Sequence, residues 1–217
     1  EGLSPDYLEE FEKILNDWCK KAIEAANKGN LPDPGKLVKE TIPFELPSIK
    51  LALETALLDL LNNGSRKIFP DAHLSQIPIN GLIWMGTIDV LQAQVLQKIG
   101  ENFKTLKIKV GSLQFSKELQ LLKWIRDSFG EKITIRLDAN GAFSNESAMD
   151  QLNAFSEYNI HSIEQPIAPG NLEKLAELCR ESPIPIALDE ELINQKEKVE
   201  LLEKIKPPYI VLKPTLL

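Results

Sequence analysis

The segment Ile133-Thr-Ile-Arg-Leu-Asp-Ala-Asn140 decides the predicted fold, because its alternating apolar and polar side chains end on a carboxylate at Asp138. Such alternation predicts a β-strand, since successive side chains of a strand point to opposite faces. The segments His161-Ser-Ile-Glu164 and Ile184-Pro-Ile-Ala-Leu-Asp189 follow the same plan. The sequence therefore predicts three strands that each carry an acidic residue at the carboxyl end.

Two further predicted strands end on an amine, namely Leu106-Lys-Ile-Lys109 and Tyr209-Ile-Val-Leu-Lys213. Positions 138, 164, 189 and 213 are separated by 26, 25 and 24 residues. A step of that size fits one strand, one helix and two loops. In a parallel α/β barrel, the carboxyl ends of the strands form the face that carries active sites. We therefore expect all five ionisable strand ends to meet at one mouth of a barrel.

The rest of this region completes an alternation of strands and helices. A first strand is predicted at 79–85. Helical periodicity follows the predicted strands at 87–99, 116–129, 144–157, 171–181 and 195–205. A closed barrel of this kind needs about eight strands. Because the last of the predicted strands ends near the carboxyl terminus, the barrel is expected to be incomplete there.

The amino-terminal part of the chain is predicted to be helical, with helices at 4–28 and 49–61. We therefore predict two domains, a helical domain at 1–75 and a βα-barrel domain at 76–217. The chain begins with Glu1 rather than methionine. Residues are therefore expected to be missing from both ends.

The composition is that of an ordinary globular protein, with 43% hydrophobic and 26% charged residues. A formal net charge of −7 argues against nucleic acid or an anionic membrane surface as a partner. We recognise neither a membrane span nor a signal peptide. Cys19 and Cys179 lack metal-type spacing, so a reduced, cytoplasmic setting is expected. The sequence gives no indication of the oligomeric state.

Strand parity predicts which side chains face the barrel interior. Thr134, Arg136 and Asp138 share one face of their strand, and Lys107 shares a face with Lys109. The apolar residues between them are expected to face the helices. Arg136 is expected to support the site by neutralising interior carboxylates.

Asp138, Glu164 and Asp189 would repel one another if they met without a cation, because buried like charges are costly. Ligands that are all oxygen atoms suit a hard ion, so the sequence predicts Mg²⁺, with Mn²⁺ as a substitute. His73 and His161 lie in no ligand-like cluster, which argues against zinc. Because His161 begins its strand, it is expected to lie at the opposite end from the site.

Lys109 and Lys213 are predicted to lie on either side of a substrate carboxylate held by this metal. That arrangement suits removal of the proton alpha to the carboxylate. One of the two lysines must be neutral to act as the base, and a like-charged neighbour or the metal can lower its pKa. Lys107 and Arg136 are such neighbours for Lys109. The expected partner is therefore a small-molecule carboxylate substrate. Trp84 is expected to be a packing residue.

Five motifs resemble those of the enolase superfamily, and within it the muconate lactonizing enzyme-like subgroup. They are Lys107-Ile-Lys109, Asp138-Ala-Asn140, Glu164-Gln-Pro166, Asp189-Glu190 and Lys213-Pro214. The resemblance covers about residues 45–217 and implies a modified TIM-type (β/α)7β barrel. Residues 1–64 look like the helical part of the α+β capping domain of that superfamily. A lysine or histidine base with Mg²⁺ is the general pattern of enolase-superfamily sites.

Within the subgroup, Pro47–Ala56, Ile79–Gly86 and Ile210–Leu217 are similar to the o-succinylbenzoate synthase family. That resemblance implies a syn dehydration of 2-succinyl-6-hydroxy-2,4-cyclohexadiene-1-carboxylate to o-succinylbenzoate, in menaquinone biosynthesis. It implies that Lys109 moves the proton while Lys213 stabilises the enediolate.

The same resemblance implies an electrostatic role for Lys107, Mg²⁺ ligation by three carboxylates and support from two further residues. The ligands would be Asp138, Glu164 and Asp189, and the supporting residues Asn140 and Glu190.

Other functions remain open at this point. N-succinylamino acid racemase, dipeptide epimerase and muconate cycloisomerase share the same set of site residues. A non-catalytic barrel protein would not need those positions to be filled. A Schiff-base lyase would use Lys213 but would leave the three carboxylates without a role.

Overall fold

The computed structural model of the chain describes residues 11–28, 33–66, 76–193 and 195–216. The chain groups into two compact units. One comprises Glu1–Ser75 together with Leu212–Leu217, and the other comprises Gln76–Val211. Among the described helices, none is long and apolar enough to cross a membrane.

The first unit is helical. Its helices are α1 (Phe11–Asn27), α2 (Pro34–Thr41) and α3 (Pro47–Leu61). The predicted helix at 4–28 is confirmed from Phe11 onward, and its earlier part lies outside the described residues. Asp33 caps the amino end of α2, because its side chain accepts a hydrogen bond from the Lys36 N–H at 2.8 Å.

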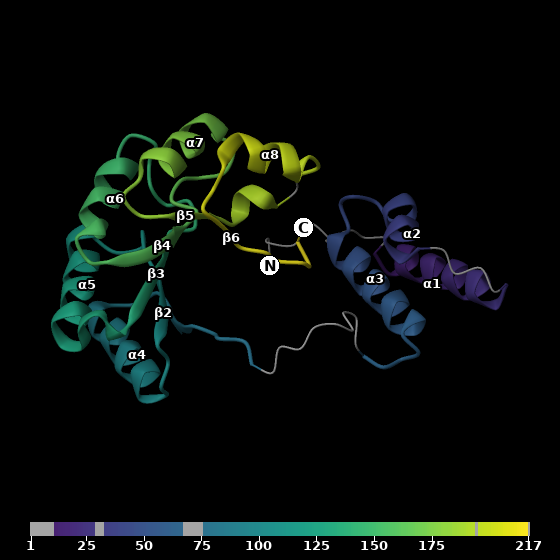
Figure 1. Cartoon of the computed structure of the whole chain (residues 1–217), viewed down its shortest axis with the longest axis horizontal. Helices are drawn as coiled ribbons and strands as arrows, with labels where there is room; N and C mark the ends of the chain where they lie inside the picture. The colour runs from purple at the N-terminus through teal and green to yellow at the C-terminus, as the bar shows by residue number, and fades with distance from the viewer. Residues whose placement is uncertain (1–10, 29–32, 67–75, 194, 217) are drawn as a thin grey trace. The chain divides into compact units, whose positions relative to one another are not determined.

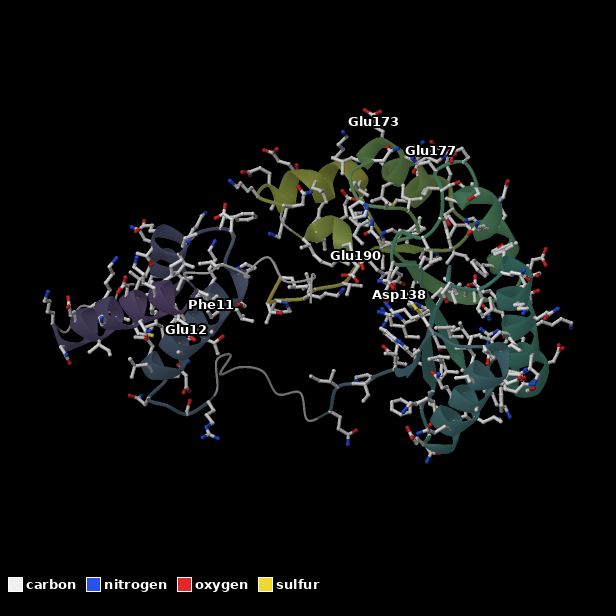
Figure 2. The ribbon with its side chains drawn as sticks, turned by 180° about the vertical axis from the view of Figure 1, so that it is seen from behind. Phe11, Glu12, Asp138, Glu173, Glu177 and Glu190 are labelled. Carbon is white, nitrogen blue, oxygen red and sulfur yellow. The ribbon has the colours of Figure 1, made fainter. Side chains whose placement is uncertain are left out.

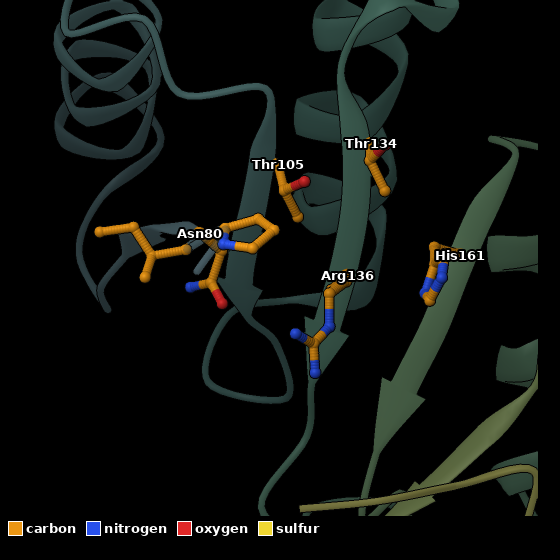
Figure 3. A pocket seen from close by; sticks show the side chains of 7 residues that line it. Asn80, Thr105, Thr134, Arg136 and His161 are labelled. Atoms are coloured by element: carbon orange, nitrogen blue, oxygen red, sulfur yellow. The ribbon is translucent and has the colours of Figure 1, made fainter. Parts of the chain in front are cut away.

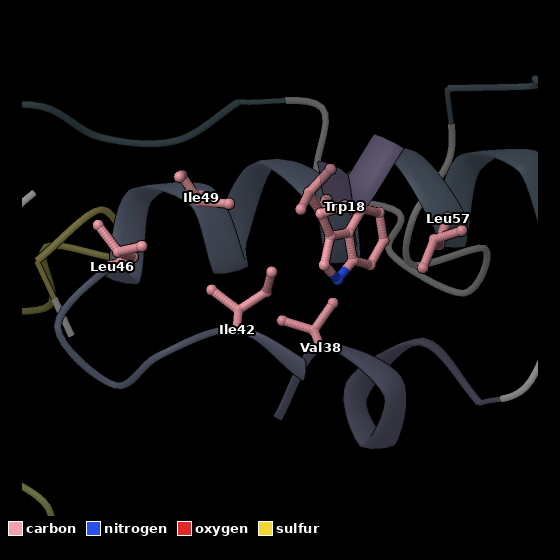
Figure 4. Packing of buried hydrophobic residues seen from close by; sticks show 7 residues of the cluster. Trp18, Val38, Ile42, Leu46, Ile49 and Leu57 are labelled. Carbon is pink, nitrogen blue, oxygen red and sulfur yellow. The ribbon is translucent and has the colours of Figure 1, made fainter. Parts of the chain in front are cut away.

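A small apolar core holds the three helices together (Figure 4). It consists of the side chains of Trp18, Val38, Ile42, Leu46, Ile49, Leu53 and Leu57. The indole N–H of Trp18 donates to the Thr41 hydroxyl at 2.6 Å, so the polar edge of the ring is satisfied inside the core.

The second unit is a parallel α/β sheet, which confirms the predicted fold class (Figure 1). Its strands are β1 (Gly81–Ile83), β2 (Thr105–Lys109), β3 (Thr134–Asp138), β4 (Ile160–Glu164), β5 (Ile186–Leu188) and β6 (Tyr209–Ile210). Neighbouring strands pair in chain order, and the described residues form an open sheet with β1 and β6 at its edges.

Helices connect successive strands and cover the outer face of the sheet (Figure 1). They are α4 (Ile88–Gly100), α5 (Phe115–Phe129), α6 (Ala148–Ser156), α7 (Leu172–Glu181) and α8 (Lys198–Ile205). Single-turn 3₁₀ helices lie at Gly130–Lys132 and Glu190–Leu192.

Side-chain alternation assigns the two faces of the sheet as predicted. Leu106 and Ile108 of β2, with Ile135 and Leu137 of β3, are at most 1% exposed, because they pack under the helices. The opposite face carries the polar residues between them. The register of β2 and β3 pairs Lys107 with Arg136 and Lys109 with Asp138, so these charged groups lie side by side.

The sixth predicted strand, at 209–213, is shorter than predicted. Strand β6 ends at Ile210, although the Val211 N–H still bonds the Leu188 carbonyl at 2.7 Å. Lys213 therefore does not end a strand. It precedes a turn closed by the Leu216 N–H on the Lys213 carbonyl, and it groups with the helical unit.

Candidate active site

Three buried carboxylates meet at the carboxyl ends of neighbouring strands. Asp138 ends β3, Glu164 ends β4 and Asp189 directly follows β5. Each is 1% exposed, and one oxygen from each lies within 4.8 Å of the others. Figure 2 shows Asp138 at this edge of the sheet, whereas Glu173 lies on the outer helix α7.

The strand register accounts for this convergence. Lys109 pairs with Asp138, and Asp138 pairs with Glu164, so three strand ends lie in one row. Between β3 and β4 the register shifts near Ile135, a bulge that restores the pairing of Arg136 with Ser162. The shift keeps Asp138 and Glu164 directly opposite each other.

Two glycines let the loops after these strands pack closely. Gly111 has a φ of 87°, and a β-carbon there would lie 2.4 Å from the Ala142 side chain. Gly141 has a φ of 75°, and its β-carbon would lie 2.9 Å from the Ala168 backbone. Larger residues would therefore push apart the loops that carry the site.

Cationic side chains bind the carboxylates directly. The Lys107 ammonium lies 2.8 Å from Asp138 and 2.5 Å from Glu164. The Lys109 ammonium lies 2.7 Å from Asp138, and the Arg136 guanidinium lies 2.9 Å from Glu164. Arg136 thus pairs with an interior carboxylate as predicted, and the two lysines also offset part of the repulsion among the carboxylates.

These contacts shift pKa values in opposite directions. Burial raises the pKa of Asp138, but the ammonium groups of Lys107 and Lys109 outweigh that effect and hold it below its usual value. Burial lowers the pKa of Lys107, and its bonds to Asp138 and Glu164 outweigh this and raise it. Burial also raises the pKa of Glu164. Lys107 is thus held as an ammonium, which fits an electrostatic role better than that of a base.

Asn140 and Glu190 extend the cluster on the side of Lys109. The Asn140 side-chain oxygen accepts from the Lys109 ammonium at 2.5 Å, and its amide nitrogen donates to Glu190 at 2.7 Å. The Asn140 backbone N–H also donates to the Asp138 carboxylate at 3.2 Å. This chain of contacts fixes the direction in which the Lys109 amine points.

Trp84 is not a packing residue, so that prediction is wrong. It follows β1 at the carboxyl end of the sheet, and it is 54% exposed. The Lys109 nitrogen lies 5.5 Å from the centre of its ring. The indole therefore forms an aromatic wall beside the amine, at a distance suited to a cation–π contact.

Lys213 groups with the helical unit, so its predicted role at the site stays a prediction. The other eight predicted site residues lie in the unit that holds the sheet. These are Lys107, Lys109, Arg136, Asp138, Asn140, Glu164, Asp189 and Glu190.

At the opposite end of the same strands lies a pocket of about 240 Å³ (Figure 3). Its lining includes Asn80, Thr105, Thr134, Arg136 and His161. His161 thus lies at the amino end of the sheet, as expected from its place in β4. Arg136 lines this pocket and also contacts the carboxylate cluster, because its guanidinium donates a hydrogen bond to Glu164.

Three supporting residues were not predicted: Glu118, Gln165 and Glu191. Glu118 is 4% exposed and accepts the backbone N–H groups of Gly111 at 2.7 Å and Leu113 at 3.2 Å. It thereby fixes the loop that follows Lys109. A glutamate on an amphipathic helix carries no signal for this role, because most such residues are solvated.

The variant Glu118→Gln is expected to unfold at a higher temperature than the unmodified protein at neutral pH. Burial raises the pKa of the Glu118 carboxyl, despite the bonds from Leu113 and Gly111, so the folded state disfavours the ionised form. The amide removes that charge and still accepts a hydrogen bond.

The pH dependence gives the sign of this effect. Because the pKa of Glu118 is raised in the folded state, its ionisation lowers the free energy of unfolding at pH values above that pKa. This loss of stability disappears as the pH falls toward 4.5, the ordinary pKa of a glutamate. Melting curves in EDTA should therefore differ at neutral pH and coincide near pH 4.5. A variant that is less stable by the same amount at every pH would contradict this account.

The carboxylate cluster fits a hard divalent cation. Asp138, Glu164 and Asp189 offer oxygen ligands only, and their ligand atoms gather within 4.8 Å. Mg²⁺ commonly takes a few carboxylates and completes its shell with water or substrate. The donor set and its closeness therefore suit Mg²⁺, with the lysines as competing cations for the same oxygens.

Together, the fold and the site define an open parallel βα sheet whose strand ends present a carboxylate cluster beside lysines. A family model described as "Enolase C-terminal domain-like" matches residues 90–215, which is more than half of the chain. The chain belongs to this family of the enolase superfamily.

Among curated proteins, o-succinylbenzoate synthase of Desulfotalea psychrophila is 45% identical over 177 residues, which is 79% of this chain and 48% of that protein. The crystal structure of MenC from Desulfotalea psychrophila LSv54 has a TM-score of 0.78 at 35% identity, and the match covers 100% of this chain and 67% of that one.

A dipeptide epimerase from Cytophaga hutchinsonii, complexed with Mg and the dipeptide D-Ala-L-Val, has a TM-score of 0.71 at 25% identity. That match covers 80% of this chain and 48% of the other. The chain spans roughly half the length of the curated relatives it matches.

Proposed function

We propose that the protein acts as an o-succinylbenzoate synthase. It would dehydrate 2-succinyl-6-hydroxy-2,4-cyclohexadiene-1-carboxylate to o-succinylbenzoate. The observation that carries the proposal is the contact of Lys109 with Asp138 at 2.7 Å, because it sets a potential base directly beside the carboxylate cluster. The 45% identity to an o-succinylbenzoate synthase supports this reaction over others of the superfamily.

In this proposal Lys109 is the proton carrier. Its neutral amine takes the proton alpha to the substrate carboxylate, the carbon–oxygen bond to the hydroxyl group breaks, and the same proton joins the departing hydroxide to form water. Asn140 orients the amine through its 2.5 Å contact, and Glu190 in turn holds Asn140. Trp84 shields one side of the amine from water.

Asp138, Glu164 and Asp189 would hold Mg²⁺, or Mn²⁺ in its place. The bound cation supplies positive charge that stabilises the anion left after proton removal. Asp138 would hold the cation and also contacts the Lys109 amine at 2.7 Å, so it would place the amine beside the cation. Lys107 adds a permanent positive charge, in keeping with its raised pKa.

Lys213 would stabilise the same anion from the opposite face of the substrate. Arg136 would hold Glu164 in place through its 2.9 Å contact. The proposal includes a role in menaquinone biosynthesis, a cytoplasmic location and a small-molecule carboxylate substrate. The division into a capping domain at 1–75 and a barrel domain at 76–217 is part of the same proposal.

Epimerisation is the second candidate. A hydrophobic dipeptide epimerase matches this chain at 28% identity, and a D-Ala-D/L-Ala epimerase matches it at 34% over 118 residues. A two-base epimerisation needs a lysine on each face of the substrate, which Lys109 and Lys213 would supply. The lower identity places this candidate behind the dehydration.

The test is to incubate the intact, Mg²⁺-loaded protein with the cyclohexadiene substrate and to follow the formation of o-succinylbenzoate by chromatography. Parallel reactions receive N-succinylamino acids and dipeptides, with deuterium exchange at the alpha carbon as the readout. We expect dehydration to be the fastest reaction by far. Exchange of a dipeptide without any o-succinylbenzoate would overturn the synthase assignment in favour of an epimerase.

A further inference from the structure

Gln165 directly follows Glu164, and its side chain is completely buried, at 0% exposed. Its φ of 38° lies in the left-handed region, which few residues other than glycine adopt. This backbone conformation takes the residue out of the alternation of β4, and its side chain reaches the turn that follows β5.

The backbone of Gln165 joins β4 to both neighbouring strand ends. Its N–H donates to the Ala187 carbonyl of β5 at 3.0 Å, and its carbonyl accepts from the Gly141 N–H at 2.7 Å. Gly141 lies three residues after Asp138 in the loop that follows β3. The backbone of one residue thus connects the ends of all three strands that carry the carboxylates.

The side chain of Gln165 uses both of its polar atoms as well. Its oxygen accepts the backbone N–H of Asp189 at 3.2 Å and of Glu191 at 3.1 Å. Its nitrogen donates to the Ile167 carbonyl at 3.0 Å, which fixes the direction of the amide. The Gln165 side chain thus contacts a candidate metal ligand, Asp189, through the backbone N–H of that residue.

A second contact holds the same turn from its other side. The Glu191 carboxylate accepts the Gly170 N–H at 3.2 Å, and Gly170 belongs to the loop that follows β4. The turn Asp189–Glu191 is therefore attached to the β4 loop at two places. Asp189 has little freedom to move relative to Glu164 while both attachments exist.

We infer that Gln165 is a positioning residue that sets the distance between Glu164 and Asp189 and thereby determines the affinity for the divalent cation. It ligates nothing itself, and it acts through the main chain of its neighbours. The inference rests on the proposed function, because that proposal includes the cation. Residues that orient metal ligands typically change metal affinity by about 10- to 100-fold when they are replaced.

Only an amide meets all three side-chain contacts. A glutamine oxygen accepts two N–H groups while its nitrogen donates to a carbonyl. A methionine has nearly the same length and volume but makes none of these bonds. In Gln165→Met, the N–H groups of Asp189 and Glu191 would remain buried without an acceptor, which favours movement of the turn.

The experiment is a calorimetric titration of the intact protein with MgCl₂ alone, in its unmodified form and as Gln165→Met. We expect the dissociation constant for Mg²⁺ to rise by about 10- to 100-fold. Gln151→Met is the matched control, because Gln151 lies on helix α6 and its side-chain amide donates to the Ser147 hydroxyl at 3.3 Å, away from the turn. Its Mg²⁺ affinity should equal that of the unmodified protein.

Loss of general stability must be separated from loss of positioning. Leu152→Ala serves this purpose, because Leu152 is 0% exposed in α6 and its truncation lowers the melting temperature without touching the turn. At a temperature where all variants are folded, Leu152→Ala should bind Mg²⁺ normally. A fall in affinity in Leu152→Ala as large as in Gln165→Met would overturn the inference.

Unchanged Mg²⁺ affinity in Gln165→Met, beside tight binding by the unmodified protein, would overturn the inference and leave the proposed function intact. No binding by the unmodified protein would overturn both. Amide hydrogen exchange in the unmodified, metal-free protein tests the contacts without any variant. The N–H groups of Asp189 and Glu191 should exchange slowly, and exchange as fast as in an open loop would contradict the geometry.

Discussion

Replacement of Lys109 by alanine is expected to lower the rate of o-succinylbenzoate formation by about 10³-fold or more. The loss follows because Lys109 is the proposed proton carrier, and the neighbouring amine of Lys107 is held as an ammonium by Asp138 and Glu164. Single-turnover assays at saturating Mg²⁺ measure the rate.

The same variant should bind Mg²⁺ at least as tightly as the unmodified protein. Lys109 competes for the Asp138 oxygen at 2.7 Å, so its removal leaves that oxygen more available. Lys123→Ala is the control, since Lys123 is an exposed lysine that pairs with Asp127 on α5. Substantial turnover by Lys109→Ala would exclude this residue as the base.

Replacement of Glu164 by glutamine is expected to abolish metal binding and turnover together. Glu164 is the central carboxylate of the row, and it also accepts from Lys107 and Arg136. Replacement of a residue that only orients ligands weakens metal binding by about 100-fold at most. Loss of a ligand itself should weaken Mg²⁺ binding by more than that. Calorimetry with MgCl₂ and the dehydration assay measure the two effects.

Glu173→Gln is the matched control, because it makes the same substitution at an exposed position on α7 (Figure 2). This variant should change neither the affinity for Mg²⁺ nor the rate of dehydration. If Glu164→Gln lost turnover but kept its Mg²⁺ affinity, Glu164 could not be a metal ligand, and its contacts with Lys107 and Arg136 would have to explain its role.

The strands with strong alternation were predictable from sequence almost to the residue. The predicted strands 106–109 and 133–138 correspond to Thr105–Lys109 and Thr134–Asp138. Period-two alternation and burial on one face leave little freedom of register there. Because a parallel sheet aligns its carboxyl ends, the meeting of the three carboxylates followed from the same pattern.

Elements that depend on local side-chain contacts were less predictable. Helical periodicity predicted a helix from residue 144, but α6 begins at Ala148. The Ser144 hydroxyl accepts the Ser147 N–H at 3.2 Å, so a serine turn takes the place of the first helical turn. Such competition between side chain and backbone leaves no trace in hydrophobic periodicity.

The interior charge balance was not predictable either. Sequence spacing predicted where the carboxylates and the amines would lie, but not that Lys107 would bond two carboxylates at once. The role of Gln165 was hidden for a related reason. Its contacts require a left-handed backbone, and nothing in the residues Glu164-Gln-Pro166 shows that conformation.

The most direct measurement is anomalous diffraction from crystals of the protein soaked in Mn²⁺. The account predicts one strong peak that is coordinated by Asp138, Glu164 and Asp189, with the Lys109 amine still beside Asp138. The account is contradicted if Mn²⁺ is absent from this position while the three carboxylates remain bound to the lysines and the arginine.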